Sequence, residues 1–144
     1  MNAVGDGIVM RVFISYSSED EKLAEGVRKR LRLAGHDVFD PAADLFPGDN
    51  WLTKTGEALE SSDAVIFLLS PQAAKSPNIR REIEFTLSGS KFKGRLLPVI
   101  FSTATHAVPW ILKRLNYMEL SPKVSSNPER AAESIVDNFS ASVA

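Results

Sequence analysis

The sequence predicts an α/β domain, a flavodoxin-like three-layer sandwich in which helices cover both faces of a five-stranded parallel sheet of order 2-1-3-4-5. One observation is that apolar runs of strand length alternate with stretches of helical periodicity. A second is the run from Ala64 to Leu69, which is apolar throughout, as expected of a strand buried on both faces of a parallel sheet. Ligands bind such sheets beyond the carboxyl ends of the strands, where the order reverses, here between the first and third strands.

The expected elements follow in chain order. They are a strand at 11–15, a helix from Ser18 to Gly35, a strand at 36–40, a loop at 41–50, a helix at 51–60, a strand at 64–69, a helix at 76–87, a strand at 95–101, a short helix at 110–115, a strand at 117–120 and a helix at 128–139. The strands are short apolar runs, and breaker residues separate them from the helices.

Particular residues mark the ends of these elements. Ser18 with Glu21 three positions later is a predicted capping box, and Gly35 suits the end of the same helix. The buried stripe of this helix is expected to be Leu23, Val27, Leu31 and Ala34. Pro98 cannot donate to an interior ladder, which predicts that the fourth strand lies at an edge or carries a bulge.

Composition narrows the classes of function. The 144 residues are 44% apolar and 24% charged, which is typical of one globular domain. The net charge of −1 argues against a nucleic-acid or membrane partner held by charge. There is no cysteine, which excludes thiolate catalysis, disulfides and zinc–thiolate sites, and we predict no metal site. No segment resembles a signal peptide or reaches transmembrane length, so we expect a cytoplasmic protein.

Glu82 lies on the wrong face of its helix. Ser76 is a predicted N-cap and Pro77 suits the first helical position. At about 100° per residue, Glu82 falls inside the apolar arc with Asn78 beside it. The arc consists of Ile79, Ile83, Phe85, Thr86 and Leu87, whereas Arg80, Arg81 and Glu84 face solvent. The Glu82 carboxylate therefore either reaches water at the edge of the buried stripe or does chemistry in a cleft.

Three segments together resemble the Toll/interleukin receptor (TIR) domain family, in its bacterial form. The first is FISYSSED at 13–20, which is similar to the opening strand of the family and the loop after it. The second is DLFPGDNW at 44–51, which is similar to the loop after the second strand. The third is LLSP at 68–71, followed by the helix that contains Glu82 and Ile83. Their order and spacing match the family over almost the whole chain.

The resemblance implies one of two activities. Many TIR domains are scaffolds that recruit other TIR domains, whereas others cleave NAD at the nicotinamide–ribose bond and release nicotinamide with ADP-ribose or a cyclic form. In the enzymes an essential glutamate early in the third helix corresponds to Glu82 here. The resemblance favours an NAD hydrolase or ADP-ribosyl cyclase in signalling or antiviral defence, with NAD as substrate and no cofactor. The alternative is a non-catalytic scaffold.

The resemblance also suggests substrate contacts. The predicted contacts are Ser15, Tyr16, Ser17, Phe46, Trp51 and Asn78. A ring of NAD is expected to stack on Trp51 or Phe46, and the loop after the first strand is expected to line the ribose or phosphate side. The alternative for Trp51 is a buried anchor of its helix, and the alternative for Tyr16 is a residue that covers the end of the sheet. The chain departs from several enzymes of the family by carrying Asn78 where they carry tryptophan.

Other enzyme classes lack their residues in this sequence. No G-x-G-x-x-G follows the first strand, so a Rossmann-type dinucleotide site is unsupported. The first and third strands end in Ser15 and Ser70 rather than in the acidic residue of a phospho-acceptor. His36 and His106 form no convincing Ser/His/Asp order.

The expected organisation is a flexible extension at residues 1–10, the TIR domain at 11–139 and a frayed tail at 140–144. The expected partners are NAD and other TIR domains. Self-association is predicted through the loop from Asp40 to Trp51, in which Pro41, Pro47 and Gly48 limit the backbone and Phe46 is a candidate exposed anchor.

Overall fold

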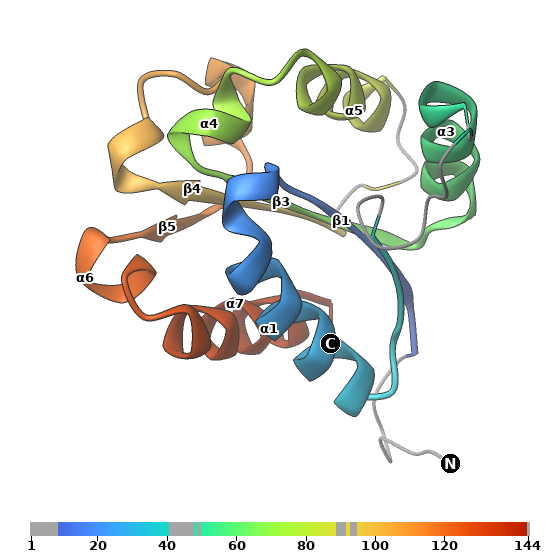
Figure 1. Ribbon diagram of the computed structural model, residues 1–144. Helices are drawn as coiled ribbons and strands as arrows, with labels where there is room; N and C mark the ends of the chain where they lie inside the picture. Colours follow the sequence, from blue (N-terminus) through green and yellow to red (C-terminus); the bar gives the residue numbers. More distant parts are fainter. Residues whose placement is uncertain (1–8, 41–47, 49, 89–91, 93–94, 144) are drawn as a thin grey trace.

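A computed structural model describes residues 9–40, 48, 50–88, 92 and 95–143, with the backbone alone at residues 51, 52 and 143. The chain forms a parallel sheet of five strands in the order β2-β1-β3-β4-β5 (Figure 1). The strands are β1 Arg11–Ser15, β2 Asp37–Phe39, β3 Ala64–Leu69, β4 Leu96–Phe101 and β5 Met118–Leu120. The predicted strand order and sandwich architecture are confirmed.

Helices cover both faces of this sheet (Figure 1). On one face lie α1 Glu21–Leu33, α6 Pro122–Ser125 and α7 Pro128–Val143. On the other lie α3 Trp51–Ser61, α4 Pro71–Ala74 and α5 Pro77–Leu87. Short 3-10 turns occur at η1 Ser18–Asp20, η2 Ser102–Ala104 and η3 Trp110–Arg114.

The alternation of side chains along β1 separates two hydrophobic cores. Val12 and Ile14 belong to the core under α1 and α7, whereas Phe13 belongs to the core under α3 and α5. Strand β3 is buried at every position and contributes to both cores, which confirms that it is the central strand. Because of this alternation, consecutive residues at the end of β1 present their side chains to opposite layers.

Helix α1 follows the prediction at its end and at three of the four stripe positions, whereas the fourth, Ala34, is its partly buried C-cap. Leu23, Val27 and Leu31 are buried. Gly35 has φ of 93°, a left-handed conformation that suits glycine, and the helix ends just before it. A Cβ at Gly26 would lie 2.9 Å from the Cβ of Ala132, so glycine at this position permits the close approach of α1 and α7.

The start of α1 differs from the predicted capping box. Ser18 lies inside η1, α1 begins at Glu21 and its N-cap is Asp20, with no side-chain capping hydrogen bond. The two carboxylates have other partners: Asp20 accepts from Ser70, and Glu21 accepts from Tyr16. Tertiary hydrogen bonds thus replace the local capping interaction that the spacing of Ser18 and Glu21 suggested.

Strand β4 is an interior strand, which corrects the expectation that Pro98 places it at an edge or a bulge. It pairs with β3 and β5, and Pro98 lies opposite Phe67 in the register with β3. Pairing with β5 begins only at Val99, so Pro98 precedes that ladder. The short outer strand explains why the sheet tolerates a proline at this position.

Several boundaries also differ by a few residues. Strand β2 lacks the expected His36 and Asp40, and β5 begins at Met118. Helix α7 continues to Val143, four residues beyond the expected end at Phe139, and Ser142 donates back to the carbonyl of Asn138.

Within the described part of the chain, no helix combines the length and apolarity needed to cross a membrane. The limits of the terminal segments stay a prediction.

Candidate functional site

Polar side chains gather where β1 and β3 end, at the reversal of the strand order. Ser15 is the last residue of β1, and Ser70 directly follows β3. The Ser70 hydroxyl donates to Asp20 at 2.5 Å, which joins the end of β3 to the segment after β1. This contact confirms that the two segments meet at one rim of the sheet, as a parallel sheet of this order requires.

Glu82 reaches this rim from α5. The Ser15 hydroxyl donates to Oε1 of Glu82 at 2.5 Å, and only 3% of Glu82 is exposed. Ser15 is two residues after Phe13 on β1, so it faces the layer that contains α5. The carboxylate is therefore buried, which excludes the interpretation that it reaches water at the edge of the stripe.

Burial dominates the electrostatics of this carboxyl group. It raises the pKa of Glu82 from 4.5 to about 7, while the hydrogen bond from Ser15 opposes the rise because it stabilises the charged form. At neutral pH the group is thus divided between its acid and its carboxylate. A carboxyl with this pKa accepts or donates a proton, or stabilises a developing positive charge, under cellular conditions.

Helix α5 begins as predicted, and this start fixes the direction of Glu82. The Ser76 hydroxyl accepts from the backbone N–H of Ile79 at 3.3 Å, and Pro77 is the first helical residue. The apolar arc is narrower than predicted: Phe85 is 42% exposed and Asn78 is exposed, whereas Glu82 and Thr86 are buried. The buried face of α5 is therefore the face that carries Ile79, Glu82, Ile83 and Thr86.

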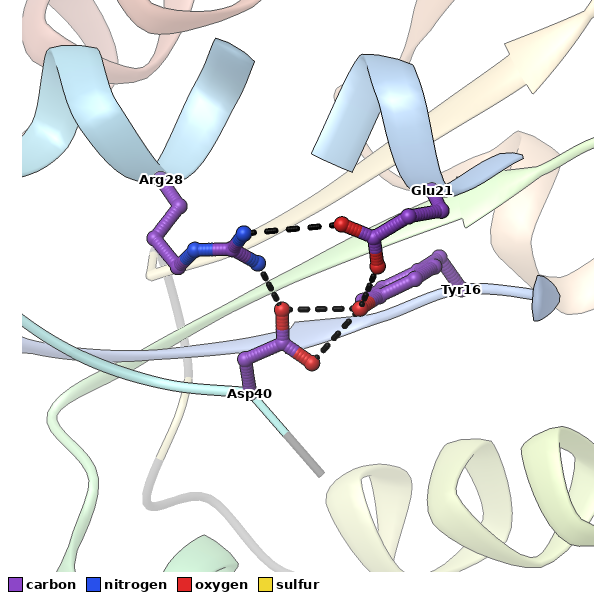
Figure 2. A network of polar contacts seen from close by, with 4 residues as sticks. All are labelled: Tyr16, Glu21, Arg28 and Asp40. Carbon is purple, nitrogen blue, oxygen red and sulfur yellow. Dashed lines mark hydrogen bonds and ion pairs between the residues drawn. The ribbon is translucent and has the colours of Figure 1, made fainter. Parts of the chain in front are cut away.

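Tyr16 lies on the opposite face of the sheet from Glu82, where it packs against the core under α1. Its hydroxyl lies 2.7 and 2.8 Å from the two carboxylate oxygens of Asp40 and 2.9 Å from Glu21 (Figure 2). Arg28 of α1 pairs with both carboxylates. These four residues are called the Tyr16 network below.

The Tyr16 network is strongly polar and is buried at Asp40, whereas the Glu21 side chain is half-exposed. Asp40 is 0% exposed, and the Arg28 side chain is 11% exposed. Burial, followed by the hydrogen bonds and charges of Asp40 and Glu21, raises the pKa of Tyr16, so the phenol stays protonated. Burial alone would lower the pKa of Arg28, but the two neighbouring carboxylates raise it overall. The guanidinium is therefore charged and balances the buried Asp40.

Asp20 is a further half-buried carboxylate at the rim. Burial raises its pKa, the hydrogen bond from Ser70 lowers it, and the charge of Glu19 raises it again. Ser70 also caps α4 by accepting from the backbone N–H of Ala73 at 3.2 Å. One serine therefore fixes both α4 and the segment that contains Asp20.

The structure brings some of the predicted substrate contacts near the rim. The Ser15 hydroxyl donates a hydrogen bond to Glu82, and Tyr16 and Ser17 follow Ser15 in the chain. Asn78 is on the first turn of α5, exposed, four residues before Glu82. Phe46 and the side chain of Trp51 lie outside the described residues, so stacking on either ring stays a prediction. The roles of all these residues in binding substrate are likewise predictions.

Sequence reasoning missed Asp20, Glu21, Arg28 and Asp40 as parts of this region. The spacing of Ser18 and Glu21 predicts a capping box and Arg28 lies on a helix with many basic residues, so neither Glu21 nor Arg28 stands out in the sequence. The available signal was the tyrosine after the first strand, together with an aspartate at the end of the second. In the described residues, no group of three or more potential ligands is arranged to hold a metal ion.

Comparisons with known proteins agree with this architecture. A family model described as a TIR domain matches residues 12–136. Among curated proteins, no match was found. Among solved structures, the chain is similar to the TIR domain of the Toll-related receptor TRR-2 from Hydra magnipapillata, with 24% sequence identity, 88% of this chain and 95% of that chain covered, and a TM-score of 0.66.

The chain is also similar to a metazoan TIR-STING receptor from C. gigas in complex with 2′,3′-cGAMP. The identity is 21%, the match covers 90% of this chain and 39% of that chain, and the TM-score is 0.66. Another structure of a C. gigas TIR-STING receptor gives 20% identity, 84% and 39% coverage, and a TM-score of 0.64. At these identities the likeness is one of fold.

Proposed function

Because the chain belongs to the TIR domain family, we propose that it cleaves NAD at the nicotinamide–ribose bond, with Glu82 as the catalytic carboxylate. The observation that carries the proposal is the buried carboxyl of Glu82 at the carboxyl end of β1, held by Ser15. A carboxyl group buried among apolar side chains costs stability, and such a cost is typical of a functional site.

The chemistry suits a single carboxylate. When the bond between ribose C1′ and the pyridinium nitrogen breaks, its electron pair passes to nicotinamide, which leaves as a neutral molecule and needs no general acid. The ribose develops the charge of an oxocarbenium ion, as in glycoside cleavage. Ionised Glu82 stabilises that charge and holds the sugar through its hydroxyls.

The fate of the ribose cation determines the product. Water adds to C1′ and loses a proton to give ADP-ribose, whereas a ring nitrogen of the adenine adds to C1′ to give a cyclic form. Ser15, Ser17 and Asn78 lie in the segments that we expect to orient the sugar and phosphates. Trp51 and Phe46 are the proposed stacking residues for a ring of the substrate.

Assembly is the second part of the proposal. TIR domains interact with other TIR domains, and we propose that this chain associates with copies of itself through the segment from Asp40 to Trp51. Its near-zero net charge opposes association only weakly. The biological role that we propose is signalling or defence in the cytoplasm.

The direct test is incubation of purified protein with NAD while nicotinamide release is followed by chromatography. We expect release by the wild-type chain and none by Glu82→Gln. Glu84→Gln is the matched control, because Glu84 is exposed on the same helix. If the wild type releases no nicotinamide at any protein concentration but still self-associates, the alternative of a non-catalytic scaffold is correct.

A further inference from the structure

The backbone pairing of β1 ends unevenly at the rim. The register with β2 ends at the pair Phe13 and Phe39, whereas the register with β3 continues to Ser15 and Phe67. The residue that holds Glu82 therefore lies beyond the last β1–β2 pair. Strand pairing holds Ser15 on the β3 side, so on the β2 side its position depends on contacts other than the ladder.

The Tyr16 network provides such a tie (Figure 2). Tyr16 is the next residue after Ser15, and Asp40 is the next residue after the end of β2. The phenol lies 2.7 Å from Asp40, so side chains join the ends of β1 and β2 beyond the point where the register ends. The contact to Glu21 joins the same phenol to the first turn of α1.

Charged groups strengthen this tie. A phenol has one proton to share between two carboxylates, and Arg28 forms an ion pair with each of them. Asp40 is fully buried, so its interactions are screened little by water. Strand alternation then places Ser15 on one face and Tyr16 on the other, and the anchored ring limits rotation of the backbone between them.

We propose that Tyr16 is a positioning residue: its anchored phenol holds the end of β1 so that Ser15 stays in hydrogen-bond contact with Glu82. The inference deepens the proposed function and rests on it for its catalytic meaning. In this inference the Tyr16 hydroxyl contacts Asp40 and Glu21 within the protein and does not contact the substrate. Burial and the Ser15 hydroxyl are the two influences on the Glu82 carboxyl, so loss of the Ser15 contact is visible as a change in how Glu82 titrates.

The test measures the titration of Glu82 in the purified chain without NAD, by carbon-13 NMR of its side-chain carboxyl. Ser15→Ala raises the titration midpoint, because the hydrogen bond that favours the carboxylate is lost. We expect Tyr16→Phe to raise it in the same direction, and the double variant to show no further rise beyond Ser15→Ala. A purely structural role for Tyr16 would lower the melting temperature without moving the Glu82 midpoint.

Turnover of NAD gives the second measurement. Tyr16→Phe is expected to lower kcat about tenfold, because it misplaces the group that stabilises the ribose cation. Tyr117→Phe is the matched control: it removes the other phenol hydroxyl of the chain, at an exposed position. It should leave both the Glu82 midpoint and kcat unchanged.

A second variant keeps the inference testable if Tyr16→Phe does not fold. Glu21→Ala removes a half-exposed member of the network, and it should move the Glu82 midpoint upward by a smaller amount. A wild-type midpoint in the folded Tyr16→Phe or Glu21→Ala chain would overturn the inference, as would fully additive shifts in Ser15→Ala with Tyr16→Phe. If the wild type does not cleave NAD, the proposed function fails, but the titrations still decide the role of Tyr16.

Discussion

The Ser15 hydroxyl donates a 2.5 Å hydrogen bond to Glu82 across 67 residues of chain. The contact joins the end of β1 to the buried face of α5, and it is a link between the sheet and the only carboxylate on that helix face. One donor cannot offset the full cost of burying a carboxylate. Ionised Glu82 is therefore destabilised in the folded chain.

Replacing Glu82 with glutamine should abolish NAD cleavage while the fold survives. The amide has the same shape but carries no negative charge to stabilise the ribose cation, so kcat should fall at least about a hundredfold. Nicotinamide release by equal amounts of wild type, Glu82→Gln and the exposed control Glu84→Gln measures the effect. Wild-type turnover by a folded Glu82→Gln chain would remove Glu82 from the mechanism.

The stability of the wild type should fall as pH rises from about 4.5 to about 7. The raised pKa means that folded Glu82 keeps its proton over a range where the unfolded chain has released it. The contribution of protonated Glu82 to the free energy of unfolding is therefore fully present below the pKa of the unfolded chain. It is lost as pH rises to the pKa of Glu82 in the folded chain. The loss is on the order of 3 kcal/mol.

Urea unfolding of the wild type and Glu82→Gln across this pH range isolates the effect of Glu82, because glutamine does not titrate. The glutamine variant should be the more stable protein above about pH 7. Parallel stability curves for the two proteins would show that burial does not perturb Glu82.

Breaking the ion pair between Arg28 and Asp40 should destabilise the fold strongly. Arg28→Met keeps much of the aliphatic length but removes the cation from a carboxylate that is 0% exposed, at a cost of about 3–5 kcal/mol. The exposed Lys29→Met is the control on the same helix and should change the free energy of unfolding by less than about 0.5 kcal/mol. Equal melting temperatures for the two variants would contradict this account of the network.

Specific NAD-cleaving activity should rise with protein concentration if the segment after β2 mediates assembly. Gly48 has φ of 93°, which proline cannot adopt, so Gly48→Pro should weaken self-association while the sheet stays folded. Gly56→Ala is the control, because a Cβ there meets nothing within 4 Å and alanine favours the helix. Sedimentation velocity and activity from nanomolar to high micromolar protein measure both effects, and flat specific activity would count against assembly.

Trp51 and Phe46 should differ in their effect on turnover if one of them stacks on the substrate. Trp51→Ala is expected to raise KM for NAD more than Phe46→Ala does. If Trp51 is instead a buried anchor of its helix, the variant should lose about 3–5 kcal/mol of stability. Thermal melts beside kinetics distinguish the two roles, and a stable, fully active Trp51→Ala chain would refute both.

Local patterns determined much of the fold by themselves. The uniformly apolar run at Ala64–Leu69 identified the central strand, because only a strand covered on both faces lacks polar positions. Ser76 and Pro77 marked the start of α5, since the first turn of a helix needs a side-chain acceptor and tolerates proline. From that start, helical periodicity alone placed Glu82 on the buried face.

Only the tertiary structure decided which partners the polar residues take. The spacing of Ser18 and Glu21 suggested a capping box, but Glu21 binds Tyr16 and the helix begins later. The position of Pro98 suggested an edge strand, but the short β5 allows an interior one. Sequence spacing reports neighbours along one element, whereas contacts such as Ser15 with Glu82 join elements far apart in the chain, and only the packing of α5 on the sheet brings such groups together.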